Sequence, residues 1–290
     1  MDGLTLFRDA LQAAFGPLDW LPEPDGCLHR FHVPGDRSGS LNGWYVLHLD
    51  GIASGAFGSW KSGESHTWSS RKPADPLEAQ LVAQRIEQAR RQREAEQHQR
   101  QQTASERAAR LWRDARRADP AHVYLAGKGC RPHTLRQLGD VLLVPLTRDG
   151  VLVNLQRIYP DGAKRFLPGG MVKGCCSPLG VITAGHPLYI CEGWATGATI
   201  HEHNGAAVAC AMNAGNLLEV GRQLQRRYPD SPLIIAGDDD RQTEGNPGRT
   251  AATHAAAALG CGLVLPPWSD AEPLTLSDFN DLRQWREANQ

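Results

Sequence analysis

Short apolar runs alternate with helix-forming segments through residues 185–290, and this alternation constrains the fold more than any other feature of the chain. The runs are bounded by turn residues, as buried parallel strands are, and they read PLYIC at 187–191, AAVAC at 206–210, PLIIAG at 232–237 and GLVL at 262–265. In one intervening segment Asn246 is placed as a helix N-cap, Pro247 at the first helical position and Gly260 just past the helix end. Strand–helix alternation with short loops predicts an α/β fold, a parallel sheet sandwiched by helices.

Acidic residues stand where two of these predicted strands end. Glu192 follows the first run, and three consecutive aspartates, beginning at Asp238 and ending at Asp240, follow the third. In an extended segment Asp238 and Asp240 point the same way, while the aspartate between them points the opposite way. A third acidic group, Asp278 and Asp281, follows near the end of the chain.

Ligands of open α/β sheets bind at the carboxyl ends of the strands. Carboxylates from three segments are therefore expected at one edge of the sheet, where like charges raise one another's pKa unless a cation neutralises them. Mg²⁺ prefers such hard oxygen ligands. From these residues alone, a solvated acidic surface loop is an equally good interpretation.

Two zones of different composition open the chain. Residues 1–75 are rich in glycine and aromatic residues in short alternating runs, which predicts a small antiparallel β-rich domain. Residues 76–118 are dominated by Gln, Arg, Glu and Ala, which favour a long charged helical connector. Its apolar stripe is thin, so a solvated connecting helix is a better interpretation than a coiled coil.

The next zone, residues 119–182, precedes the predicted parallel sheet at 183–290. We predict a short helix pair over 122–139 and then three strands separated by turns at 148–150 and 160–162, a small mixed α+β subdomain. Basic residues gather along this zone, namely Arg157, Lys164, Arg165 and Lys173.

The composition is that of a soluble globular protein, with 41% hydrophobic and 22% charged residues and a net charge of −1. No apolar run approaches the ~20 residues needed to span a membrane, and the start has no secretory signal, so we expect a cytoplasmic protein without a membrane partner. The seven cysteines include no CxxC pair, which argues against a disulfide framework or a zinc ribbon. Cys27, His29 and His32 lie close together but lack a second ligand pair, so no zinc is expected.

The motifs resemble a known family. Glu-Gly at the end of one predicted strand and Asp-x-Asp at the end of another, with the glycine-bearing NGAAVACAMNAGNL between them, resemble the Toprim domain of topoisomerases and bacterial-type primases. VYLAGKGCRPHTLRQL resembles the entry to the primase catalytic core. LLVPLTRDGVLVNLQRIYPDGAKRFLPGG resembles that core's basic subdomain, which topoisomerases lack. The resemblance covers residues 118–285 and is nearest to the Toprim primases of phages, plasmids and integrative elements.

The resemblance implies a DNA primase, a nucleotidyltransferase that makes short primers on a single-stranded DNA template from nucleoside triphosphates. It implies Glu192 as general acid–base, Asp238 and Asp240 as the metal-binding pair for Mg²⁺ or Mn²⁺, and Asp278 and Asp281 as supporting acidic residues included among the metal ligands. The basic residues Arg157, Lys164, Arg165 and Lys173 would meet nucleic acid and nucleotide phosphates. A separate replicative helicase is implied as partner, since no GxxxxGK[ST] occurs in the chain.

The sequence departs from the family pattern in places, and two other functions compete with priming. Thr196 stands where many Toprim domains have aspartate, and the zinc-ribbon cysteines of primases are missing from residues 1–75. One alternative is a Toprim nuclease that uses the same carboxylates for hydrolysis. The other is a non-catalytic single-stranded-DNA-binding or anti-restriction accessory protein.

Overall fold

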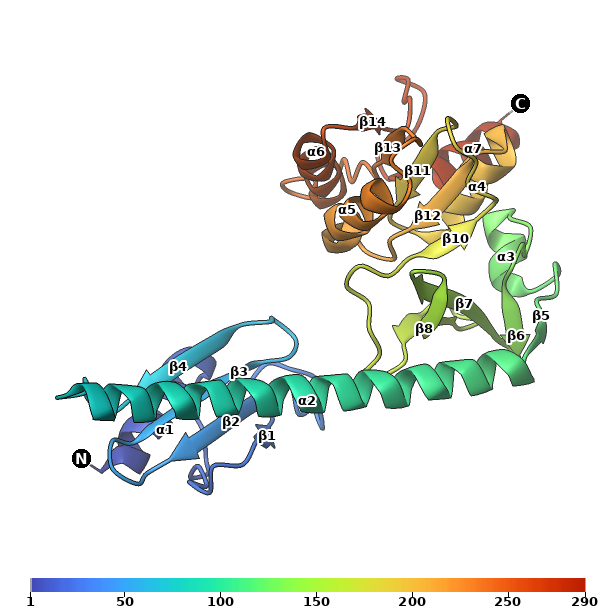
Figure 1. The fold of residues 1–290 in the computed structure, drawn as a ribbon. Helices are drawn as coiled ribbons and strands as arrows, with labels where there is room; N and C mark the ends of the chain where they lie inside the picture. The colour runs from blue at the N-terminus through green and yellow to red at the C-terminus, as the bar shows by residue number, and fades with distance from the viewer. Residues whose placement is uncertain (1, 290) are drawn as a thin grey trace. The chain divides into compact units, whose positions relative to one another are not determined.

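The chain forms two compact units, Met1–Gln99 and Arg100–Gln290 (Figure 1). The computed structural model describes residues 2–289. One helix, α2 (Pro76–Asp114), begins in the first unit and ends in the second. It occupies most of the segment 76–118, for which the sequence predicts a helical connector. It is long but highly polar, and no helix between residues 2 and 289 combines the length and apolar character that membrane crossing requires.

The first unit is a four-stranded antiparallel sheet in the order β1-β2-β3-β4. Its elements are α1 (Gly3–Phe15), β1 (His29–Phe31), β2 (Gly43–His48), β3 (Ser54–Ser59) and β4 (Ser65–Ser69). Alternation along β2 sends Tyr45 and Leu47 to a core shared with Phe7 of α1, and Trp44 to a second core shared with Ala89 of α2. Both faces of the small sheet are therefore covered.

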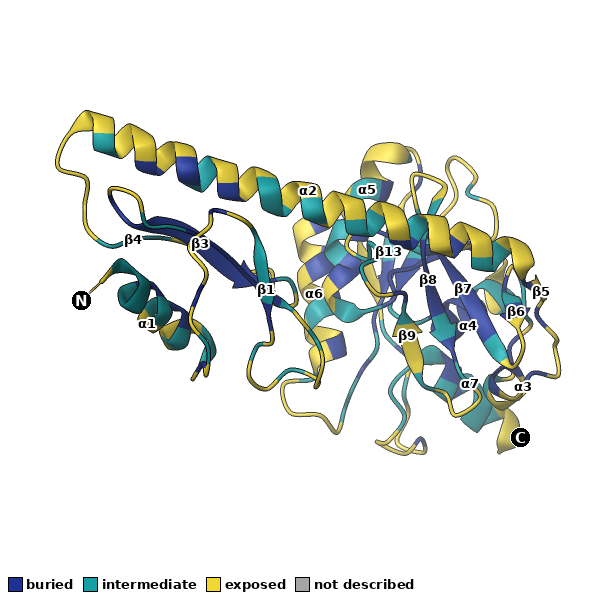
Figure 2. Ribbon diagram, turned by 90° about the horizontal axis from the view of Figure 1, so that it is seen from below, coloured by how far each residue is buried: buried dark blue, intermediate teal, exposed yellow. Residues whose placement is uncertain are grey.

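The second unit begins with an antiparallel sheet in the order β5-β6-β7-β8-β9. Its elements are β5 (Arg116–Arg117), α3 (Val123–Lys128), β6 (Arg136–Leu138), β7 (Val141–Arg148), β8 (Val151–Ile158) and β9 (Lys164–Phe166). One face packs Leu143 and Leu155 against Ala108 of α2, and the other face packs Leu142 and Ile158 into the main core of the unit. Figure 2 shows β7 and β8 largely in the dark blue of buried residues, while much of α2 is yellow.

The predicted helix pair over residues 122–139 is wrong in its second member. The chain forms α3 and then the strand β6, in which Arg136 pairs with Leu143 of β7. Gly129 adopts a left-handed conformation with φ of 59° and ends α3. The positive φ of 47° at His133 then departs from helical geometry, and residues 136–138 pair with β7 instead.

The rest of the second unit is a five-stranded sheet in the order β10-β12-β11-β13-β14, in which only β10 is antiparallel to its neighbour. The strands are β10 (Ser177–Leu179), β11 (Leu188–Cys191), β12 (Ala207–Cys210), β13 (Leu233–Ala236) and β14 (Gly262–Val264). The helices are α4 (Trp194–Asn204), α5 (Leu217–Arg227), α6 (Pro247–Leu259) and α7 (Phe279–Ala288), with a 3₁₀ turn η1 (Ala214–Asn216) before α5. The predicted α/β class, with a parallel sheet between helices, is confirmed.

Helices cover both faces of this sheet. Trp194 and Ala198 of α4 pack against Cys191 and Cys210 on one face, while α5 and α6 pack against the other. The helix α4 approaches the sheet so closely that a Cβ on Gly197 would lie 2.4 Å from the Cys210 sulfur. A glycine in EGWATG therefore brings α4, and with it the segment that carries Glu192, onto the sheet.

Candidate active site

The acidic residues from three segments come together at the carboxyl edge of the parallel sheet. Glu192 directly follows β11, and Asp238 follows β13 after one glycine. These strands are neighbours, with Cys191 opposite Ala236. Asp278, the N-cap of α7, is close enough for its charge to raise the pKa of Asp238.

Asp238 is the carboxylate that the cluster affects most. Burial, followed in decreasing order by the charges of Asp278, Glu192, Asp240 and Asp281, raises its pKa to about 8. Its Oδ1 atom is buried and has no hydrogen-bond partner within the described residues. Because a buried carboxylate oxygen is costly without a donor or cation, Asp238 and its neighbours fit a hard cation such as Mg²⁺.

The pKa values of two other carboxyls shift in the same direction. Burial and then the charge of Asp240 raise the pKa of Glu192, against a hydrogen bond from the Ala214 backbone and the charge of Lys164. Burial and then the charge of Asp281 raise the pKa of Asp278. Burial is thus the largest cause of each shift, and a neighbouring carboxylate adds to it.

The aspartates after β13 alternate in direction. Asp240 Oδ2 accepts a hydrogen bond from the Gly248 backbone N–H (2.9 Å) at the start of α6, and the charge of Asp240 acts on Glu192. Asp239 is only 4% exposed and accepts from Asn246 Nδ2 (2.6 Å) and from Trp268 Nε1 (3.0 Å). Asp239 therefore anchors the loop, while its two neighbours face the cluster.

Asp278 and Asp281 both have partners within the protein. Asp278 Oδ1 accepts from the Asp281 backbone N–H (2.8 Å) and so caps α7. Asp281 Oδ1 lies 3.3 Å from Lys128 Nζ. These two residues begin a helix and supply charge to the cluster at the same time.

Lys164 is the predicted basic residue that faces the carboxylates. It lies opposite Ile158 in the β8–β9 pair, and Ile158 belongs to the main core that also contains Cys191. Although Lys164 is exposed, desolvation by the surrounding protein and then the charge of Lys128 lower the pKa of its ammonium. The charges of Asp278, Glu192 and Asp238 oppose that shift, so the lysine lies close enough to interact with these three carboxylates.

Arg157 and Arg165 lie on the opposite face of the β8–β9 pair from Lys164. They oppose each other across the two strands, and opposed residues share a face while consecutive residues alternate. Their guanidinium carbons lie 5.8 and 5.6 Å from the ring centroid of Tyr159. Lys173 is exposed in the segment between β9 and β10. The four predicted basic residues are thus not one cluster.

The sequence interpretation assigned no role to Lys128 or Asn216. Lys128 ends α3 and pairs with Asp281, 153 residues away in the chain. The buried Asn216 side chain donates to the carbonyls of Val172, Cys175 and Ala211 and accepts from the Gly174 N–H. For Lys128, the sequence signal that could have indicated a role is the Lys-Gly pair in the segment VYLAGKG. For Asn216, a single asparagine gives no such signal.

The first unit contains a separate group of potential ligand atoms. Within residues 2–289, three such atoms lie within 4.8 Å of one another at Glu23, Asp25 and His29. Among these described residues, the strand-end carboxylates do not form a group as close as this. His29 Nε2 already pairs with Asp25 Oδ1 at 2.9 Å. His32 Nδ1 lies 3.0 Å from the Ser40 carbonyl, so the structure does not bring His32 together with His29 and Cys27 as one such group.

The raised pKa of Asp238 predicts how stability depends on pH when metal is removed. In the unfolded chain this carboxyl loses its proton near its ordinary pKa of 3.8, whereas the folded chain retains the proton up to about 8. Folding therefore becomes less favourable as pH rises between these values. Asp238→Asn has no such proton, so at pH 8 in EDTA its free energy of unfolding should exceed that of wild type by about 1–3 kcal/mol. Urea unfolding at pH 5 and pH 8 checks this; an equal difference at both pH values would contradict it.

Residues 187–288 match the Toprim domain family. Two curated proteins, each described as DNA primase TraC of Escherichia coli, are similar over most of the chain. One is 36% identical over an alignment of 264 residues that covers 87% of this chain and 18% of the relative. The other is 37% identical over an alignment of 267 residues that covers 87% of this chain and 25% of the relative. The chain thus spans about a quarter or less of the length of these relatives.

Two solved structures are also similar. The primase fragment of the bacteriophage T7 primase-helicase protein has a TM-score of 0.43 at 14% identity and covers 58% of this chain and 71% of its own. The zinc-binding and RNA polymerase domains of the Aquifex aeolicus primase have a TM-score of 0.42 at 13% identity, over 100% of this chain and 85% of their own. With TM-scores of this size, the relationship to known proteins rests on the sequence comparisons and not on these two structures. Residues 187–288 of the chain therefore match the Toprim domain family, and most of the chain is similar in sequence to two proteins described as DNA primase.

Proposed function

We propose that this chain is the catalytic part of a metal-dependent DNA primase, which synthesises short oligonucleotides on a single-stranded DNA template. The observation that carries the proposal is the convergence of Glu192, Asp238 and Asp278 at one sheet edge with Lys128 and Lys164 beside them. A polyanion-binding protein without catalysis has no use for a carboxylate cluster that repels its ligand. A nucleotidyltransferase needs carboxylates for cations and cations for phosphates.

Asp238 and Asp240, supported by Asp278 and Asp281, are the residues that would hold Mg²⁺ or Mn²⁺. When bound, the ion would neutralise charge on the α-phosphate and on the pyrophosphate leaving group. The Glu192 carboxylate is proposed to take the proton from the attacking 3′-hydroxyl, and its half-buried position keeps its pKa above that of a free glutamate. Lys164 and Lys128 would bind the triphosphate.

Arg157 and Arg165 are proposed to contact the template rather than the nucleotide. They flank Tyr159 on the face of β8–β9 that is turned away from the carboxylates. The two guanidinium groups beside Tyr159 offer positive charge for phosphates of the template. Lys173 would add a further phosphate contact.

The wider setting is also proposed from the relatives. Synthesis would serve the replication of a phage or other mobile element in the cytoplasm, with a separate helicase as partner. The β-rich unit 1–75, the connector 76–118, the basic subdomain 119–182 and the Toprim domain 183–290 are the domains we propose. No zinc is proposed for the first of them.

A priming assay tests the function directly. The chain is incubated with circular single-stranded DNA, ribo- or deoxynucleoside triphosphates, and Mg²⁺ or Mn²⁺, and labelled products are sized on a gel. Short products that require template, nucleotide and metal support the proposal. Cleavage of the circle would instead indicate a Toprim nuclease, and binding without either reaction would indicate an accessory protein.

The two faces of the β8–β9 pair should separate nucleotide binding from template binding. Arg165→Met should weaken single-stranded DNA binding and reduce the slope of log affinity against log salt by about 0.7 for each phosphate that is no longer bound. Lys164→Met should leave that slope unchanged and raise KM for the nucleotide instead. Salt titrations by fluorescence anisotropy, with Arg226→Met on the exposed side of α5 as control, measure this. Equal effects of the Lys164 and Arg165 changes on the salt slope would contradict the division.

A further inference from the structure

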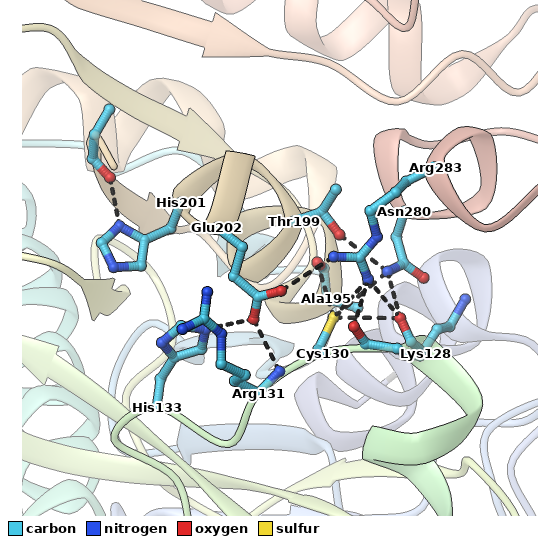
Figure 3. A network of polar contacts seen from close by, with 12 residues as sticks. Lys128, Cys130, Arg131, His133, Ala195, Thr199, His201, Glu202, Asn280 and Arg283 are labelled. Carbon is cyan, nitrogen blue, oxygen red and sulfur yellow. Dashed lines mark hydrogen bonds and ion pairs between the residues drawn. The ribbon is translucent and has the colours of Figure 1, made fainter. Parts of the chain in front are cut away.

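One face of α7 holds the C-terminal end of α3 (Figure 3). Asn280 Nδ2 and Arg283 Nη2 each donate to the Lys128 carbonyl at 2.8 Å. Arg283 Nη2 also donates to the Gly129 carbonyl (2.8 Å), and Gln284 Nε2 donates to the carbonyl before Lys128 (2.6 Å). The last carbonyls of a helix have no partner within it, so side chains of α7 satisfy the end of α3.

Glu202 of α4 fixes the guanidinium of Arg283. Glu202 Oε2 lies 3.1 Å from Arg283 Nη1, and Oε1 accepts from His133 Nε2 (2.7 Å) and the Arg131 backbone N–H (2.8 Å). Against the effect of burial, hydrogen bonds from Arg131, His133 and Arg283 lower the pKa of Glu202, which therefore stays charged. The planar fork of Arg283 thus joins α7 to α4 and to the end of α3.

Asn280 adds a buried link in the same place. Its side chain is 0% exposed, and Nδ2 also donates to Thr199 Oγ1 of α4 at 2.9 Å. A buried amide is costly unless its donors are used. Here they fix where the end of α3 lies relative to α4 and α7.

The same helix carries the acidic partner of the Lys128 side chain. Asp281 Oδ1 is 3.3 Å from Lys128 Nζ, while Asn280 and Arg283 hold the Lys128 carbonyl. Both ends of Lys128 are therefore attached to α7. This attachment sets the distance between the ammonium and the carboxylate of Asp278, which caps the same helix.

We propose that Arg283 and Asn280 are positioning residues that hold Lys128 beside the carboxylate cluster, where its ammonium binds a phosphate of the incoming nucleotide. Neither residue touches the nucleotide. The proposal rests on the proposed function for the identity of the ligand as a nucleoside triphosphate with a divalent cation. Its structural part, the dependence of Lys128 on Arg283, can be measured by binding alone.

A double-mutant cycle on ATP binding tests that dependence. Titration of the whole chain with ATP and Mg²⁺, without template, gives Kd for wild type, Lys128→Met, Arg283→Met and the double variant. Each single change should raise Kd about tenfold, the usual effect of removing one charge-assisted hydrogen bond. The double variant should bind no more weakly than Lys128→Met, because Arg283 acts through Lys128. A KM increase with little change in kcat is expected in the priming assay.

Two further variants separate positioning from folding. Arg286→Met removes a guanidinium from the same helix, where it pairs with the buried Glu272 (Nε to Oε1, 2.9 Å) away from Lys128. It should lower the melting temperature but leave Kd for ATP unchanged. Arg283→Lys keeps the charge without the fork, so it should bind ATP with a Kd between those of wild type and Arg283→Met.

The outcomes distinguish this proposal from the proposed function. Independent, multiplicative effects of Lys128→Met and Arg283→Met on Kd would overturn the positioning role, even in an active primase. The same follows if Arg286→Met weakens ATP binding as much as Arg283→Met does, because the effect would then be one of helix stability. A chain that shows the predicted coupling but makes no primers would retain the positioning role and lose the primase assignment.

Discussion

Asp238→Asn should reduce primer synthesis by about three orders of magnitude or more at saturating Mg²⁺, while the chain remains folded. The substitution keeps the volume of the side chain but replaces an anionic ligand with a neutral amide. The Asp238 carboxylate already has a pKa raised to about 8 by burial and by four neighbouring acids, and its buried Oδ1 has no partner within the described residues. Asp240→Asn should follow the same direction. Gel assays over a range of Mg²⁺ concentrations measure both effects.

Asp239→Asn is the matched control for this prediction. The residue lies between the two proposed ligands, but its carboxylate accepts from Asn246 and Trp268 instead of facing the cluster. The same substitution there should lower the melting temperature and leave most of the activity. Near-wild-type synthesis by Asp238→Asn, or an equal fall in synthesis for Asp238→Asn and Asp239→Asn, would remove the reason for assigning the metal to Asp238.

Elements with strong local signals were predictable from the sequence. The strand β13 and the helix α6 follow from an apolar run and from Asn246, Pro247 and Gly260 at the helix ends, and the structure has them there. The opposite directions of Asp238 and Asp239 follow from the alternation of an extended chain. The strand β6 was mistaken for a helix because its pairing with β7, not its own composition, makes it a strand.

Contacts between distant segments were not predictable in the same way. Lys128 and Asp281 are far apart in the chain, and nothing local to either one indicates the other. Asn280 lies between Asp278 and Asp281, and the sequence predicts a role for the two aspartates only. The buried Asn280 amide nevertheless links α7 to α3 and α4. A polar residue's burial depends on the packing of whole helices. Periodicity within one segment cannot supply that information.

Glu192→Gln should separate binding from chemistry. The substitution removes one negative charge from a cluster that meets a polyanion, so affinity for single-stranded DNA and for ATP should be unchanged or slightly higher. Turnover should fall by about two to four orders of magnitude, because an amide cannot accept the proton of the 3′-hydroxyl. Anisotropy with labelled oligonucleotide, ATP titration and priming assays on the same preparation measure the three quantities.

This prediction distinguishes catalysis from a purely structural use of the carboxylate. Glu192 follows β11 directly and accepts a hydrogen bond from the Ala214 backbone, an interaction that the glutamine oxygen preserves, so the fold should be unaffected. If Glu192 served only to complete that contact, the glutamine variant would make primers at the wild-type rate, and the proposed mechanism would be wrong. If instead both binding and turnover fell together, Glu192 would act by organising the site. A fall in turnover with binding intact is the result that a proton-transfer role predicts, because the reaction needs the carboxylate whereas binding does not.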